Sequence, residues 1–142
     1  MSKGNTFEND WLLLIFNATT IANIAINATS SPLTSLYVSL HTADPGEAGD
    51  QTTSEATYTG YARVAVARTS GGWTVSANSV SPAATITFGA CTVGTNTITH
   101  FAVGTATSGA GKILYSGTVT PNIAVSVGVT PSLTTATAIT ED

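Results

Sequence analysis

Side chains that could carry out chemistry are sparse in this 142-residue chain, and none stands in a catalytic motif. The nucleophile elbow G-x-S-x-G does not occur. Cys91 could be paired with His41 or His100 as thiolate and base, but nothing in their spacing supports such a pair. We expect both histidines to make structural hydrogen bonds and Cys91 to pack as a small apolar residue. The sequence therefore predicts that the protein is not an enzyme.

Motifs for phosphate, metal or sugar chemistry are also incomplete. Gly109–Lys112 hints at a phosphate loop, but Ala106 stands where its first Gly belongs and Ile113 where Ser or Thr should bind magnesium. A glycosidase needs two carboxylates at a fixed separation, whereas half of the acids here gather in one segment. A single cysteine cannot form an intrachain disulfide or a zinc site by itself. We expect no cofactor.

The acidic segment runs from Asp44 to Gly60 and lacks bulky aliphatic residues. Its carboxylates are Asp44, Glu47, Asp50 and Glu55, four of the eight acids. One interpretation is a calcium site, because hard cations favour several carboxylate and carbonyl oxygens in a loop. The spacing does not match the D-x-[DN]-x-[DN]-G pattern, so the prediction is a solvated acidic loop without a metal ion.

Two arginines follow this segment and are half of the four basic residues. Arg63 and Arg68 could pair locally with an acid and pin the loop, each exposed pair contributing about 0.2–1 kcal/mol. They could instead make bidentate contacts with a carboxylate of another subunit. Both interpretations stay open. The candidate interaction residues are therefore Trp11, Asp44, Glu47, Asp50, Arg63 and Arg68.

The overall charge narrows the possible partners. Charged residues make up 8% of the chain, against about 25% in an average soluble domain. The net charge of −4 argues against binding to a nucleic-acid backbone, which requires clustered Lys and Arg. From Thr69 to Thr140 the one full charge is Lys112. Such a surface of hydroxyls and methyls suits packing against other proteins.

The N-terminal residues predict a helix from residue 6 to about 24. Asn5 and Glu8 resemble a capping arrangement, and acids near the start favour the helix dipole. Its expected apolar face is Phe7, Trp11, Leu14, Ala18 and Ile21, which either covers the protein's own core or partly meets a neighbouring subunit. The apolar run is short and broken by Asn17, which argues against a signal peptide or a membrane span.

After Pro32 the apolar period changes to two, which predicts about eight strands. They are expected at 36–41, 61–68, 73–78, 84–88, 97–104, 112–119, 123–129 and 133–139, with a turn at Thr120–Asn122. No helix separates them, so the sheets should be antiparallel. The predicted fold is an antiparallel β-sandwich or jelly roll in a single domain over 1–142, with a helix and connecting loop over 1–31 and the sandwich over 32–142.

Several segments together resemble a family of tailed-bacteriophage virion proteins. They are LYVSLHTADPGEAG at 36–49, YARVAVAR at 61–68, FEND-W-L in the helix, ITHFAVG at 98–104 and ILYSGTVT at 113–120. Members are often labelled tail fibre proteins, and some look like capsid decoration, or cement, proteins with a jelly-roll fold. The resemblance implies a structural role in the virion.

This resemblance gives two expectations for function. The first is a non-enzymatic protein that decorates the capsid and bridges neighbouring shell subunits. Its partners would be the major capsid protein and copies of itself as a dimer or trimer, with no direct nucleic acid and no membrane. It would be made in the host bacterial cytoplasm and end on the capsid surface. The alternative is a tail-fibre or receptor-binding accessory module that recognises host-surface glycans through exposed Tyr58, Tyr61 and Trp73.

Overall fold

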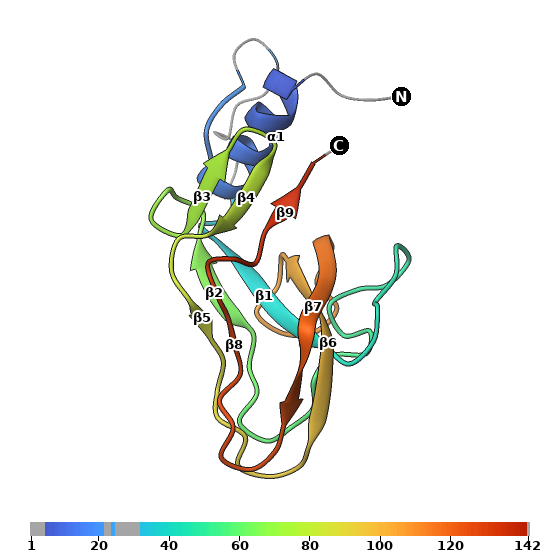
Figure 1. Cartoon of the computed structure of the whole chain (residues 1–142). Helices are drawn as coiled ribbons and strands as arrows, with labels where there is room; N and C mark the ends of the chain where they lie inside the picture. The colour runs from blue at the N-terminus through green and yellow to red at the C-terminus, as the bar shows by residue number, and fades with distance from the viewer. Residues whose placement is uncertain (1–4, 22–23, 25–31, 142) are drawn as a thin grey trace. The chain divides into compact units, whose positions relative to one another are not determined.

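The computed structural model describes residues 5–21, 24 and 32–141. Within them the chain forms one helix and nine strands (Figure 1). Their bounds are α1 Asn5–Asn17, β1 Ser35–His41, β2 Val64–Ala67, β3 Trp73–Ser76, β4 Ser79–Pro82, β5 Ile86–Thr87, β6 Asn96–Gly104, β7 Ile113–Val125, β8 Ser132–Leu133 and β9 Ile139–Thr140. The pairs β1–β6, β6–β7, β3–β4 and β4–β9 are antiparallel. The predicted class, all-β with antiparallel sheets and an N-terminal helix, is confirmed and is consistent with a β-sandwich.

The chain divides into two compact units. Unit 1 consists of Met1–Ser35, Val66–Thr85 and Leu133–Asp142, and unit 2 of Leu36–Ala65 and Ile86–Ser132. That the whole chain is a single domain stays a prediction. In the part of the chain that is described, no helix is long and apolar enough to cross a membrane.

In unit 1, α1 packs against the β3–β4 hairpin, and β9 pairs with β4 (Figure 1). Leu12 and Phe16 are fully buried, and the Phe16 ring meets Trp73 edge-on with centroids 4.7 Å apart. Of the predicted apolar face, Phe7 and Trp11 are 41% and 38% exposed, so these two residues do not cover the core of unit 1. Apolar residues almost surround this helix, so its periodicity could not indicate which side the hairpin covers.

The helix also ends earlier than predicted, at Asn17 rather than near residue 24. Ala18 follows it with a φ of 53°, a left-handed conformation that cannot continue an α-helix. The Thr19 N–H donates to the Leu13 carbonyl at 3.0 Å, which closes the helix end. The remainder of the predicted helix and its connecting loop falls partly on 22–23 and 25–31, outside the described residues.

The four-stranded sheet has the order β2-β1-β6-β7. Strands β1 and β6 pair from Tyr37↔Gly104 to His41↔His100. The last four residues of β1 are all buried, so both of its faces are covered. Apolar side chains from these strands and from their flanking segments fill the core of unit 2, among them Leu36, Val38, Leu40, Ile98, Phe101 and Val103.

The edge strand β7 corrects another prediction. Residues 113–125 form one strand, where the sequence predicted two strands and a turn at Thr120–Asn122. The register shifts between Ile98↔Ile123 and His100↔Thr118, which leaves Val119–Asn122 opposite the single residue Thr99. The extra residues form a bulge that takes up Pro121, and an edge strand tolerates proline because its outer side needs no ladder donor.

Candidate interaction site

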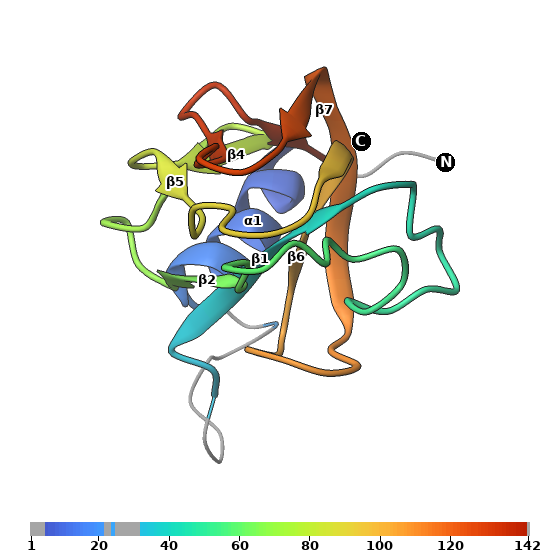
Figure 2. The same ribbon diagram turned by 90° about the horizontal axis from the view of Figure 1, so that it is seen from below.

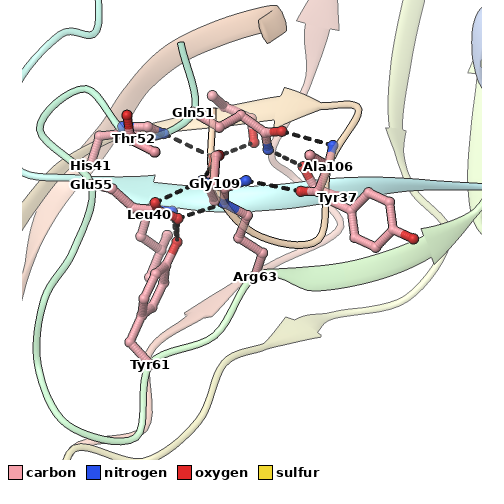
Figure 3. Close-up of polar contacts among 12 residues, drawn as sticks. Tyr37, Leu40, His41, Gln51, Thr52, Glu55, Tyr61, Arg63, Ala106 and Gly109 are labelled. Carbon is pink, nitrogen blue, oxygen red and sulfur yellow. Dashed lines mark hydrogen bonds and ion pairs between the residues drawn. The ribbon is translucent and has the colours of Figure 1, made fainter. Parts of the chain in front are cut away.

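Arg63 and Glu55 form an ion pair in unit 2, in which the arginine is buried and the glutamate is partly buried (Figure 3). The Arg63 Nε and Nη2 donate to the two carboxylate oxygens of Glu55 at 2.7 and 2.8 Å. The same guanidinium donates to the carbonyls of Ala106 at 3.0 Å and Gly109 at 2.8 Å. The hydrogen bonds with Glu55 raise the Arg63 pKa. This arginine therefore joins the acidic segment to the β6–β7 loop.

Tyr61 completes what we call the Arg63 cluster, which consists of Glu55, Tyr61 and Arg63. The Tyr61 hydroxyl donates to Glu55 Oε1 at 2.9 Å and accepts the Leu40 N–H at 3.0 Å (Figure 3). Burial raises the Tyr61 pKa far above its usual range, so the phenol stays protonated. Each charged or polar group of the cluster has a partner within the protein, which makes the cluster a clamp rather than a reactive site.

A buried glutamine holds the acidic segment at a second point. Gln51 is fully buried, and its amide donates to the Tyr37 carbonyl at 3.1 Å and accepts from the Ala106 N–H at 3.0 Å (Figure 3). A β-carbon at Gly104 or Gly111 would collide with this amide, so a larger residue at either position would displace Gln51 from its hydrogen bonds. The segment is thus anchored at Gln51, while Asp44 and Glu47 are exposed, as the prediction of a solvated loop requires.

His41 and Ser39 form a fully buried pair on β1. The carbonyl of Thr53 lies 2.8 Å from His41 Nδ1 and can only accept, so Nδ1 carries the proton. His41 Nε2 lies 2.9 Å from the Ser39 hydroxyl and therefore accepts. Burial lowers the His41 pKa. The predicted structural hydrogen bonds are confirmed for His41.

Cys91 is buried as predicted. Its thiol lies 3.4 Å from the Gly94 carbonyl and 3.6 Å from that of Val93. The thiol is 1% exposed, so it packs inside unit 2 as a small apolar residue.

Arg68 binds the C-terminal end of α1 in unit 1. It donates to the carbonyls of Leu14 and Ile15 at 2.8 and 2.6 Å and to that of Leu33 at 2.7 Å. The last carbonyls of a helix lack intrahelical donors and carry partial negative charge, so a guanidinium stabilises them. Burial lowers the Arg68 pKa.

The predicted partners of the arginines need correction. Arg63 pairs with Glu55 rather than with Asp44, Glu47 or Asp50. Asp44 accepts the Gly46 N–H at 2.9 Å, and Glu47 is exposed. The Asp50 carboxylate accepts the Thr52 hydroxyl at 2.5 Å, and this hydrogen bond lowers its pKa. Among the described residues, no three His, Cys, Asp or Glu side chains gather as metal ligands would.

A groove of about 380 Å³ lies beside β7 in unit 2. One wall is the start of the acidic segment, with Asp44, Gly46, Glu47 and Gly49, and the other is Ile113–Ser116. Side chains alternate between the two faces of a strand, so a groove touching four consecutive residues lies along the strand's edge. Figures 1 and 2 both show the loop after β1 on the β7 side of the sheet.

Two of the three aromatic residues of the glycan hypothesis are buried. Trp73 and Tyr58 are 2% and 3% exposed, and the Tyr61 hydroxyl belongs to the Arg63 cluster. Trp11 is partly exposed and lies 6.4 Å from the Phe7 ring. Sequence reasoning missed Gln51 and Tyr61 as anchors. The position of Glu55 in the acidic segment, close to Arg63 in sequence, could have indicated an ion pair between them. Nothing in the sequence distinguished Gln51 from an ordinary loop residue.

The described residues form antiparallel β-sheets with one helix, and the Arg63–Glu55 pair is satisfied within the fold. Residues 5–140 match the model of the family described as Podophage GP4 fiber I protein gp80, and the chain belongs to this family. The predicted membership of a tailed-phage virion protein family is therefore confirmed. No curated protein matches the chain.

Proposed function

We propose that the protein is a non-enzymatic fibre component of a tailed-phage virion and that it acts by packing against other virion proteins. The family match over residues 5–140 carries this proposal, because the family is described by a fibre protein. The burial of the residues in unit 2 that could act in catalysis agrees with a non-enzymatic role. The Ser39–His41 pair and Cys91 are buried among their own hydrogen-bond partners, out of reach of a substrate.

The mechanism is burial of weakly charged surface against neighbouring subunits. Strand β7 has no charged residue, and its exposed side chains are small: Ser116, Thr118, Thr120, Pro121, Asn122 and Ala124. Lack of charge removes the repulsion and desolvation cost that would oppose close packing. A standard interface buries roughly 800 Å² per partner, and repeated contacts in one particle multiply modest affinities.

Decoration of the capsid, with bridging of neighbouring shell subunits, is the second candidate. The same uncharged hydroxyl surface favours it, since many copies can lie side by side on a shell without electrostatic repulsion. The partners would then be the major capsid protein and further copies of this chain. A receptor-binding role through exposed aromatics has less support, because Trp73 and Tyr58 are buried.

The experiment that tests the proposal locates and counts the protein in purified particles. Gold-labelled antibody against the chain, imaged by electron microscopy, should mark the tail, and quantitative mass spectrometry should count a few to some tens of copies. Labelling over the whole head with hundreds of copies would establish the decoration role instead. A particle without the protein would overturn both candidates.

A further inference from the structure

Three loops of unit 2 are joined into what we call the tip, which consists of residues 57–60, 91–95 and 126–129. Thr59 and Val93 form an antiparallel bridge, in which the Thr59 N–H donates to the Val93 carbonyl at 2.9 Å. Cys91 joins the third loop, because its N–H donates to the Val129 carbonyl and its carbonyl accepts the Gly128 N–H. Figure 1 shows these loops at one end of unit 2, where β6 begins and β7 ends.

Glycines and one side chain fix the shape of the tip. Each loop contains a glycine with a positive φ, which is 104° at Gly60, 94° at Gly94 and 89° at Gly128. Residues with a β-carbon rarely adopt such values. The Asn96 side chain also accepts two successive main-chain N–H groups of the first loop, at 2.9 and 3.0 Å. A surface that is ordered in advance loses less conformational entropy when it binds.

Two large apolar side chains are exposed at the tip. Val93 is 63% exposed and Val127 is 67% exposed. Among the described residues, the other exposed large apolar side chains all belong to unit 1; they are Phe7, Trp11, Ile24 and Leu33. Unit 2 therefore concentrates its exposed apolar side chains in two neighbouring loops of fixed shape. Covering them removes apolar surface from water, which favours association.

The tip has no charge, and the exposed acids of unit 2 lie far from it. Its three loops contain no Asp, Glu, Lys, Arg or His. Asp44 and Glu47 lie beside the start of β7, which pairs with β6 at Ala102–Gly104. From Asn96 at the tip to Ala102, strand β6 extends roughly 20 Å. This separation exceeds twice the Debye length of about 8 Å at physiological salt.

We propose that the tip binds the tip of a second copy of this chain, so that uncharged apolar surface is buried between the two copies. Each copy has a net charge of −4, so two copies repel each other where their acids approach. A contact between tips avoids this repulsion, because the exposed acids stay beyond the screening distance. A two-fold contact uses the same residues on both copies. This inference rests on the proposed structural role in the virion and names one partner for it.

Two aspartate substitutions test the contact in solution. Val127→Asp places a charge in the tip, whereas Ser108→Asp places the same charge in the exposed β6–β7 loop of unit 2. Sedimentation equilibrium of the purified wild type should show pairing by millimolar concentration, the range that linked sites reach in an assembly. We expect Val127→Asp to raise the dissociation constant at least tenfold and Ser108→Asp no more than twofold. Thermal melting checks that both variants fold.

Salt provides a second readout that needs no variant. A contact without ion pairs between two acidic copies should hold or tighten as salt screens their repulsion. A tenfold weakening of the wild-type pair between low and high salt would overturn the tip contact, because pairing would then depend on opposite charges.

A photo-crosslinking residue at position 127 identifies the occupant of the tip in assembled particles. We expect an adduct that joins two copies of this chain, with the attachment point on the second copy within the tip. The same residue at position 108 should give at least fivefold less of this adduct. An adduct with another virion protein instead, or no adduct, would overturn the tip contact.

Failure of the tip contact and failure of the proposed function give different results. Absence of the wild-type protein from purified particles would overturn the proposed function. A wild type that is present in particles but stays monomeric at millimolar concentration would overturn the tip contact alone. Equal weakening by Val127→Asp and Ser108→Asp would also overturn it, because pairing would then not depend on the tip.

Discussion

The carboxylates of the acidic segment lie in two different environments in unit 2: one is bound by internal partners, and two face solvent. In the Arg63 cluster, Glu55 is held by a guanidinium and a phenol, and the Arg63 side chain is 2% exposed. In the groove beside β7, Asp44 and Glu47 face solvent without a described ion pair. Acids that stabilise this fold are matched internally, and those left unmatched are the ones available to another molecule.

Removing Arg63 should have the largest effect on stability. Arg63→Ala leaves the Glu55 carboxylate, whose side chain is only 18% exposed, without its cation and takes donors from the Ala106 and Gly109 carbonyls. Breaking a buried pair by removing one partner costs about 3–5 kcal/mol. Urea unfolding should show this loss. Arg63→Lys keeps the positive charge but not the bidentate guanidinium contacts, so it should recover only part of the lost stability relative to Arg63→Ala. Full recovery would show that the charge alone matters.

Removing Arg68 should cost less, because its described contacts are carbonyls. Arg68→Ala takes donors from Leu14, Ile15 and Leu33 at the end of α1. A hydrogen bond to a charged group contributes about 1.5–3 kcal/mol, and partly exposed contacts fall at the lower end. Hydrogen exchange should accelerate in the last turn of α1 while the amides of β6 stay protected. Acceleration in both places would contradict a role restricted to unit 1.

The sequence predicted the strands best where apolar residues alternate. Strand β6, expected at 97–104, forms over Asn96–Gly104 because its period of two is uninterrupted. Strand β4, at Ser79–Pro82, was missed because its residues are small or proline and its hairpin turns at Ala77 with a φ of 52°, which non-glycine residues rarely adopt. Proline at 121 indicated a turn, yet a bulge at the sheet edge accommodates it.

The arginine contacts show why the site was harder to predict than the fold. Four acids of one segment are near Arg63 in sequence, and nothing in their spacing singles out one. A bridge between His41 and Glu55 sets Glu55 beside the end of β1, where Tyr61 also donates to it. Gln51 likewise depends on the space beside Gly104 and Gly111. These choices follow from tertiary register, which local patterns do not encode.

Because His41 is buried, the free energy of unfolding should depend on pH in the range in which a histidine titrates. Burial lowers the His41 pKa in the folded state below the usual 6.5. The unfolded chain then binds the proton first, so stability is fully present above about pH 6.5 and falls as the pH drops toward the lower folded-state pKa. The free energy of unfolding should decline more steeply between pH 7 and 5 in the wild type than in His41→Gln, since only the wild type has this group. Equal slopes would contradict the assignment.

The smallest expected effect on stability is at the groove. Glu47→Gln removes an exposed carboxylate that takes part in no described ion pair, so the free energy of unfolding should change by less than about 0.5 kcal/mol. Copies per particle should nevertheless fall at least threefold if the carboxylate meets a basic side chain in the groove. The matched control is Asp50→Asn, because Asp50 belongs to the same segment but does not line the groove. A loss of copies with Asp50→Asn but not with Glu47→Gln would reverse the comparison. Binding would then depend on how the segment is held and not on the acids that it leaves exposed.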